Sequence, residues 1–387
     1  MASATILTTN SPREDDNEYV FFHSGGVPTY RKVVHRANSQ EKANIIPTID
    51  ISEIDTSIEA RKKLAKEIYH ACTTSGFFYL SGHGVPEELL NGTFDLMKRF
   101  FALDHETKMD AHVQKNPAIR GYEPMFETRL DPRTQGDIKE AFTMGDDPLE
   151  PEQEYTAKTG NPPPAGMHRP LNTWPREAPW WREGLYKYYN TLMPLSLKVI
   201  RLMALAFDLE ETAFDHYFKF PITGIRTLHY PPMPKESEPG AVGLGAHSDN
   251  TWLTMVLQDQ VPALEILSKD GVWIAAEPKP NTFVCNVGRF LERVTNSKFI
   301  ATVHRVRNMT GERRYSLAFF QTPDPDAVIK VLDCCLEPGE GPKQDEDTVG
   351  DLYVRRVLPA RPKHPKSNKY QHVPVNELKY DLFYTDI

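Results

Sequence analysis

Two histidines and one aspartate are the first residues of the chain whose types and spacing suggest chemistry. His247 and Asp249 lie two residues apart within residues 244–250, and His304 follows within residues 302–306. Alternate residues of an extended chain face the same way, so one segment can offer an imidazole and a carboxylate to one ion. Two imidazoles and one carboxylate leave the opposite side of a metal open, a ligand set typical of non-haem Fe(II) oxygenases. Either histidine alone would more often be a core or surface residue, but together the three residues predict an iron site.

A second group of residues could bind an anion beside that site. Arg314 and Ser316 alternate in the apolar run 314–321, so that a guanidinium and a hydroxyl point to the same face. Such a pair can hold a carboxylate by charge-assisted hydrogen bonds, although an exposed arginine at a sheet edge is the alternative. Tyr230 could add a phenolic hydroxyl, or it could be a buried structural tyrosine. The pattern predicts an anion-binding strand next to the metal.

Short strands must position both groups. Beyond residue 220 the apolar residues alternate in brief runs separated by turns such as 269–271, which favours a jelly roll or a barrel. The expected strands of this half are residues 225–230, 253–258, 264–267, 272–275, 283–287, 299–306 and 314–321.

The first half of the chain mixes strands and helices. Alternation predicts strands at residues 45–51 and 76–80, and three- and four-residue spacing predicts helices at 60–72, 86–101 and 181–207. Pro194 predicts a kink in the last helix. Residues 111–175 are rich in proline, glycine and charge, which is typical of a long functional loop.

Composition favours small-molecule chemistry. The 387 residues are 40% hydrophobic and 25% charged, with a net charge of -8 and no long basic block, so neither nucleic acid nor an acidic membrane is an expected partner. Only four cysteines occur, without CxxC spacing, and no apolar leader or membrane-spanning stretch is visible. We therefore expect a cytoplasmic protein. Because no heptad pattern demands a partner, we expect a monomer or a weak homo-oligomer.

An ordered series of motifs supports a family assignment. The chain resembles the iron(II)- and 2-oxoglutarate-dependent dioxygenases of the isopenicillin N synthase-like branch, over roughly residues 45–358. Arg289 departs from the family pattern, because relatives usually have an aspartate after the corresponding glycine. The matching segments are residues 46–50, 72–86, 120–122, 137–140, 229–231, 271–274 and 283–296, followed by the metal and anion motifs.

The resemblance implies a fold and a cofactor set. The expected fold is mixed α/β with a mainly β core, a double-stranded β-helix (jelly roll) flanked by helices. His247, Asp249 and His304 would bind Fe(II), whereas Arg314 and Ser316 would hold the distal carboxylate of 2-oxoglutarate. Tyr230 matches a frequent helper of that pair. O2 is the second cosubstrate, and ascorbate is an optional supporting reductant.

The implied activity is the oxidation of a small organic molecule, with release of succinate and CO2. Hydroxylation, desaturation and cyclisation are all compatible with the motifs, and relatives of this kind often serve specialised metabolism. One alternative is an iron-dependent oxidase that does not use 2-oxoglutarate. Another is a non-catalytic jelly-roll protein that binds a small molecule.

Composition, apolar pattern and the resemblance together suggest regions and substrate contacts. We expect a flexible arm over residues 1–44, an N-terminal region with an irregular substrate loop over 45–175, a catalytic core over 176–358, and a C-terminal extension over 359–387 that serves as a lid. The expected substrate contacts are Arg120, Phe142, Leu253, Phe320 and Thr322. The alternative for each of them is an ordinary position in the cavity wall or on the surface.

Overall fold

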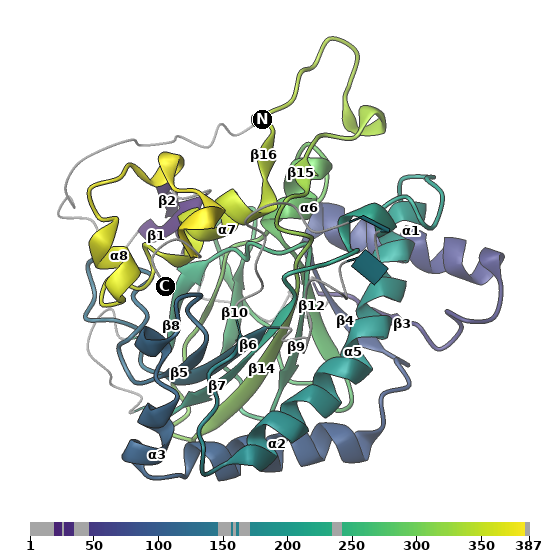
Figure 1. The fold of residues 1–387 in the computed structure, drawn as a ribbon. Coiled ribbons are helices and arrows are strands. Elements are labelled where there is room, and N and C mark those ends of the chain that lie inside the picture. Colours follow the sequence, from purple (N-terminus) through teal and green to yellow (C-terminus); the bar gives the residue numbers. More distant parts are fainter. Residues whose placement is uncertain are drawn as a thin grey trace.

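Two β-sheets enclose the centre of the protein in a computed structural model that describes residues 19–24, 27–34, 46–145, 156–157, 160–161, 171–233 and 242–383 (Figure 1). The larger sheet has eight strands and the smaller has four. In spatial order the large sheet contains β3 (Thr48–Asp50), β4 (Phe77–Ser81), β12 (Phe283–Val287), β9 (Leu253–Gln258), β14 (Arg314–Gln321), β7 (Gly224–Tyr230), β6 (Glu140–Gly145) and β5 (Gly121–Glu123).

The small sheet completes a double-stranded β-helix with the central strands of the large one. Its order is β11 (Trp273–Ala275), β10 (Leu264–Leu267), β13 (His304–Val306) and β8 (Leu244–His247). Buried apolar residues from both sheets meet between them, among them Leu228 and Val284 of the large sheet and Ile266 of the small one. The expected jelly-roll fold is therefore confirmed.

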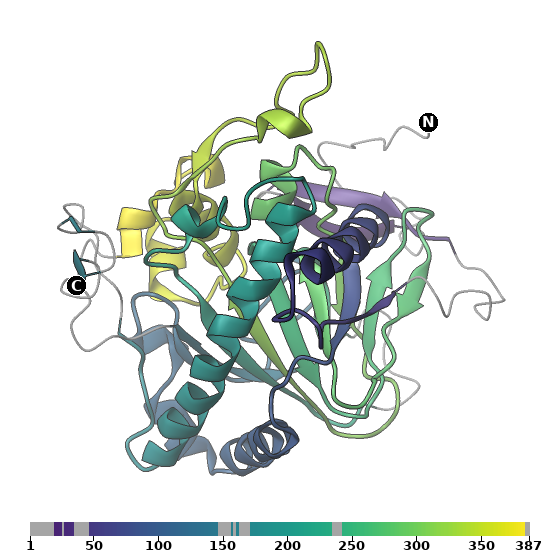
Figure 2. The ribbon, with the colours of Figure 1, turned by 90° about the vertical axis from the view of Figure 1, so that its right-hand side faces the viewer.

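Helices cover the outer face of the large sheet (Figure 2). These are α1 (Ile58–Thr74), α2 (Glu87–Phe101) and α5 (Pro179–Leu205), each within two residues of its predicted bounds. Ser57 caps α1 by accepting a hydrogen bond from the Ala60 amide at 3.1 Å. Ile68 and Leu192 on these helices pack into one core with residues of the sheet. The helices therefore fix the sheet from outside and leave its inner face for the site.

Strand alternation divides β14 between two environments. Leu317 and Phe319 join the core beneath the helices, whereas Arg314 and Ser316 face the space between the sheets. On β7, Leu228 and Tyr230 face that same space. This division decides which residues of each strand can reach the site.

Two predictions for the first half are wrong in part. Within the expected flexible arm, β1 (Tyr19–Ser24) and β2 (Val27–Lys32) pair as an antiparallel hairpin, because Phe22 and Val33 bury apolar surface against Ala246 and its neighbours. Of residues 1–44, those at 1–18, 25–26 and 35–44 lie outside the described residues. Strands β5 and β6 lie within the expected irregular loop and extend the large sheet.

In the second half, the strand expected over residues 299–306 is shorter, because only His304–Val306 pairs with neighbours. Upstream of it, the amide of Ile300 instead donates to the carbonyl of Cys72 at the end of α1.

The C-terminal segment packs over one end of the β-helix, beside β8 (Figure 1). Leu378 and Phe383 contact Val354 and Leu358 from the region of helix α7 (Val349–Val357), together with Val113. The remaining elements are α3 (His105–Asp110), α6 (Arg289–Val294), α8 (Pro365–Lys369), β15 (Val328–Ile329), β16 (Asp347–Thr348) and 3₁₀ turns at Val113–Lys115, Asp215–Tyr217, Asp333–Cys335, Val375–Glu377 and Tyr380–Phe383.

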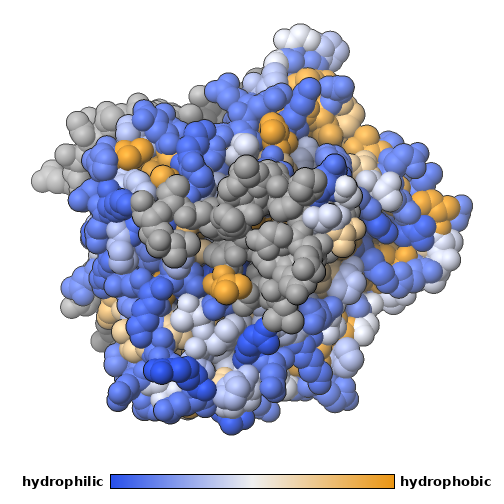
Figure 3. Space-filling model, viewed as in Figure 1, coloured by the Kyte–Doolittle hydropathy of each residue, from blue (hydrophilic) through white to orange (hydrophobic). Residues whose placement is uncertain are grey.

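The surface in Figure 3 is mainly hydrophilic, with apolar residues in several separate groups. Among the described helices, none combines the length and the apolar content needed to cross a bilayer.

Candidate metal centre

Three side chains converge where β8 meets β13. His247 ends β8, and its direct partner on the neighbouring strand is His304. The Nε2 atoms of His247 and His304 lie 3.4 and 3.7 Å from Oδ1 of Asp249. One ligand atom from each residue lies within 4.8 Å of the others, as a single metal ion requires. The structure thus brings the three predicted ligands together.

Backbone carbonyls orient both imidazoles. The Nδ1 of His247 donates to the carbonyl oxygen of Gly245 at 2.9 Å, and the Nδ1 of His304 donates to that of Thr302 at 3.1 Å. Since a carbonyl can only accept, each ring carries its proton on Nδ1 and leaves Nε2 with a free lone pair.

Hydrogen bonds also select one oxygen of Asp249. Its Oδ2 accepts from the hydroxyl of Thr254 and from the amide of Asn286, each at 2.8 Å. Burial would raise the pKa of this carboxyl, but His304, His247 and Asn286 together lower the pKa below its ordinary value. Oδ1 therefore stays anionic and free to bind a cation.

The electrostatics of His304 suit the same role. Burial, followed by repulsion from His247, lowers the pKa of His304 to about 4, against the pull of Asp249. The imidazole is consequently neutral near pH 7, which is the state that binds a metal. Two nitrogens and one carboxylate oxygen on one side of a cavity fit Fe(II).

The backbone at Gly288 packs closely against Thr251, next to the segment that carries Asp249. A Cβ on Gly288 would lie 2.1 Å from the carbonyl oxygen of Thr251, so that only glycine fits there. The amide of Arg289 donates to the carbonyl of Asp249 at 2.8 Å, while its side chain pairs with Glu292. Arg289, where relatives usually have an aspartate, therefore points its side chain to Glu292 and leaves the position of Asp249 unchanged.

Arg314 lies on the inner face of the large sheet and is 1% exposed. Its Nη1 donates to the Ser316 hydroxyl at 3.1 Å and its Nη2 to Oε1 of Gln258 at 3.0 Å. Nε donates to the carbonyl of Val261 at 3.2 Å. All of these partners are neutral, and no carboxylate of the described residues forms an ion pair with this guanidinium. A buried cation without an anionic partner is a binding site for one.

Tyr230 lies beside Arg314, and it packs toward the metal ligand His304 through Phe77. Its ring lies 5.1 Å from the Arg314 guanidinium, and burial raises the pKa of its phenol, so the hydroxyl keeps its proton at neutral pH. Tyr230 shares an apolar cluster with Phe77, whose ring packs edge-on against His304 with centroids 5.4 Å apart.

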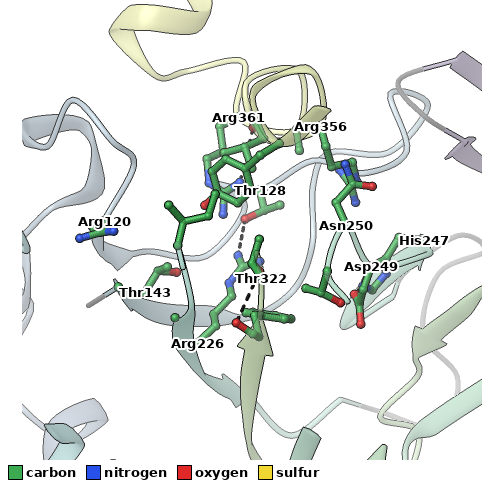
Figure 4. A pocket seen from close by; sticks show the side chains of 18 of the residues that line it. Arg120, Thr128, Thr143, Arg226, His247, Asp249, Asn250, Thr322, Arg356 and Arg361 are labelled. Carbon is green, nitrogen blue, oxygen red and sulfur yellow. Dashed lines mark hydrogen bonds and ion pairs between the residues drawn. The ribbon is translucent and has the colours of Figure 1, made fainter. Parts of the chain in front are cut away.

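A cavity of about 140 Å³ opens beside His247 and Asp249, beneath α7 (Figure 4). Of the predicted substrate contacts, Arg120, Phe320 and Thr322 line this cavity.

The predictions that Phe142 and Leu253 contact the substrate are wrong. Phe142 lies on β6, and its ring packs against Phe100 and Trp181 under the helices. Leu253 is fully buried in the same core. Both residues occupy the strand positions that face outward, and the alternation along their strands turns them away from the cavity.

Several polar residues of the site were not predicted. Thr254 and Asn286 hold Asp249, Gln258 holds Arg314, and Arg226 and Arg356 line the cavity. Alternation along β7 with Tyr230 was an available signal for Arg226. No comparable signal marks Arg356, because helix α7 reaches the cavity only through tertiary packing.

Comparison with known proteins agrees with this geometry. Residues 46–177 match the family described as non-haem dioxygenase in morphine synthesis N-terminal, and residues 221–323 match the 2OG-Fe(II) oxygenase superfamily. A 2-oxoglutarate-Fe(II) type oxidoreductase of Emericella nidulans is 35% identical, covering 79% of this chain and 87% of the relative. A 2-oxoglutarate-Fe(II) type oxidoreductase of Metarhizium majus is 33% identical, covering 86% and 92%.

Solved structures agree as well. A full-length Neurospora crassa protein in complex with alpha-KG and thymine has a TM-score of 0.70 and 25% identity, covering 81% of this chain and 96% of that one. A putative 2OG-Fe(II) oxygenase family protein from Caulobacter crescentus has a TM-score of 0.68 and 30% identity, covering 81% and 98%. The chain therefore belongs to the 2OG-Fe(II) oxygenase superfamily and is a 2-oxoglutarate-dependent Fe(II) dioxygenase, an oxidoreductase.

Proposed function

We propose that Nε2 of His247, Oδ1 of Asp249 and Nε2 of His304 bind the Fe(II) ion. One observation carries this assignment. Hydrogen bonds occupy Nδ1 of each histidine and Oδ2 of Asp249, so that the two Nε2 atoms and Oδ1 remain available to bind one ion. Bound Fe(II), together with 2-oxoglutarate and O2, supplies an oxidant able to break a C–H bond. The chain orients the ligands, excludes water from the interior and presents the substrate.

Arg314, Ser316 and Tyr230 hold the distal carboxylate of 2-oxoglutarate in this proposal. The buried guanidinium gains an anionic partner, and the hydroxyls of Ser316 and Tyr230 can donate to its oxygens. Gln258 keeps the guanidinium in place from the neighbouring strand. The cosubstrate is thereby anchored at one end, within the same enclosed interior as the metal.

The substrate in this proposal is a small organic molecule of specialised metabolism that enters the cavity beneath α7. Arg120, Phe320 and Thr322 would contact it. The reaction is a hydroxylation, a desaturation or a cyclisation, with release of succinate and CO2.

We also propose a cytoplasmic location and a monomer or weak homo-oligomer. All four cysteines are free thiols in the structure, which suits a reducing compartment. The division into regions at residues 45, 176 and 359 stays a prediction. Light scattering of the purified protein would measure its oligomeric state.

Anaerobic titration of the metal-free protein with Fe(II) and then with 2-oxoglutarate tests the site. We expect a weak visible metal-to-ligand charge-transfer band in the wild type and its loss in His247→Ala and Arg314→Ala. Arg313→Ala removes an exposed neighbouring charge and should keep the band. Iron binding without a band would favour an oxidase that does not use 2-oxoglutarate. A protein that binds no iron would be a non-catalytic jelly roll.

A further inference from the structure

We propose that Arg356 binds an acidic group of the substrate, so that the enzyme oxidises a small organic acid. This inference rests on the proposed function of the site. It concerns a guanidinium on α7 that lines the same cavity as His247 and Asp249. Figure 4 shows the side chain extending from α7 toward Asn250, beside the metal ligands.

The position of Arg356 is fixed by its helix. Asn250, next to the metal ligand Asp249, donates through Nδ2 to the carbonyl of Leu352 at 3.0 Å. On the other side of α7, Asp351 accepts from Lys379 and from the amide of Tyr380, each at 2.8 Å. Helix α7 is therefore attached both to Asn250, next to the metal ligand Asp249, and to the C-terminal segment. These contacts fix the helix that carries Arg356 beside the cavity.

Other cations of the cavity already have partners. Arg226 and Arg361 pair with the buried carboxylate of Glu123 at 2.6 and 2.9 Å, and Arg226 also donates to Thr128. Arg120 contacts Asn172. These groups hold the wall of the cavity together.

Arg356 has no such partner among the residues that the structure describes. Its neighbour Arg355 pairs with Asp347 and donates to the carbonyl of Leu378, but no described residue forms a hydrogen bond or an ion pair with Arg356. Burial and repulsion from Arg361 lower the pKa of Arg356 to about 10, so it remains charged at neutral pH. A half-buried charge without a partner is costly unless a ligand supplies the counter-charge.

The metal centre cannot supply that counter-charge once it is loaded. Fe(II) carries two positive charges, Arg314 carries one, Asp249 carries one negative charge, and 2-oxoglutarate carries two. These charges cancel, and Asp249 is occupied by the metal, Thr254 and Asn286. Asp137, the other carboxylate that acts on Arg356, accepts from the amide of Gly245 through Oδ1 and has no hydrogen-bond partner at Oδ2. Burial raises the pKa of this carboxyl, and among the described residues it forms no ion pair with Arg356. The positive charge of Arg356 is left for the substrate.

The other residues that line the cavity indicate the character of the rest of the substrate. Leu130, Ile222, Leu244 and Val357 line the same cavity and add apolar surface to it. This combination fits a compact apolar body that carries one carboxylate.

A binding comparison tests the proposal independently of turnover. Protein loaded with Mn(II) and 2-oxoglutarate under argon is mixed with a panel of small aromatic and aliphatic monocarboxylic acids, each paired with its neutral primary amide, and binding is read by saturation-transfer NMR. We expect at least one acid to bind roughly tenfold more tightly than its amide, and Arg356→Gln to abolish that preference. Lys62→Gln, on the exposed face of α1, removes the same charge and should preserve the preference.

Two further measurements separate this role from others. Thermal unfolding of Arg356→Gln should show no loss of stability, because an unpaired charge is removed, whereas Arg361→Gln should be destabilised by the loss of its Glu123 pair. The Fe(II)–2-oxoglutarate band should persist in Arg356→Gln. Loss of the band there would assign Arg356 to the cosubstrate and overturn the proposal. Equal binding of acids and amides, or no binding of any acid, would overturn it too, while an absent band in the wild type would contradict the proposed binding of Fe(II) or of 2-oxoglutarate.

Discussion

His247 and His304 are direct partners on the neighbouring strands β8 and β13, and their ring centroids lie 4.3 Å apart. Antiparallel pairing therefore places two ligands from distant parts of the chain at one point, and Asp249 joins them because it follows β8 immediately. A slip of one residue in this register would turn one imidazole to the other face of the sheet. The metal site is thus a property of strand pairing as much as of residue type.

Removing a hydrogen bond to Asp249 should weaken iron binding. Asn286→Ala leaves Oδ2 with only the Thr254 hydroxyl, so that the carboxylate is less well oriented, and we expect Fe(II) affinity to fall about 10–100-fold. Anaerobic titration measures the dissociation constant, and thermal unfolding confirms that the variant is folded. Asn91→Ala, exposed on α2, is the matched control. Unchanged affinity in Asn286→Ala would show that Asp249 needs no such support.

Changes at the anion site should separate cosubstrate binding from metal binding. Arg314→Lys keeps the charge but loses the planar fork that contacts Ser316 and Gln258, and we expect the dissociation constant of 2-oxoglutarate to rise roughly tenfold or more. Ser316→Ala should cost less, about 3–10-fold, because one neutral hydrogen bond is lost. Fe(II) affinity, measured without 2-oxoglutarate, should stay the same in both. A parallel loss of iron affinity would place Arg314 in the metal site itself.

The metal-free protein should lose stability in mild acid. The pKa of His304 in the folded state is about 4, below the 6.5 of an unfolded histidine, so the unfolded chain binds more protons between these values. Stability contributed by the neutral imidazole is present above pH 6.5 and falls as the pH drops toward 4, by at most about 1.4 kcal/mol per pH unit. Chemical denaturation across pH 4–7 measures this slope, which should be shallower in His304→Gln. Equal slopes would show that His304 titrates normally.

Phe142 and Phe320 should respond differently to truncation. Phe142→Ala empties a fully buried position between Phe100 and Trp181, and we expect unfolding free energy to fall by about 3–5 kcal/mol. Phe320→Ala should cost less stability, because its side chain borders the cavity, and should instead alter which substrates are accepted. Urea denaturation of both variants checks the contrast. A small stability loss in Phe142→Ala would indicate that its ring is not part of the core.

Much of the site was determined locally by the sequence. Arg314 and Ser316 are spaced by two within β14, and the alternation of the strand places both on one face. His247 and Asp249 have the same spacing, which predicted that they share an ion, although Asp249 lies just beyond the end of β8. Strands β9, β10, β12 and β14 were predicted at their observed bounds, because their apolar runs are short and end at turns. These features depend on neighbours in the chain and therefore appear in the sequence.

Tertiary packing decided the rest. Phe142 and Leu253 were assigned to the cavity, but only the pairing of β6 and β9 within the large sheet shows that they face the helices. Phe22 is buried only because β8 lies beside its hairpin. Arg356 reaches the cavity because Asn250 and the C-terminal segment hold α7 over it. Such contacts join residues far apart in the chain, so their energies depend on the folded arrangement and leave no periodic pattern in the sequence.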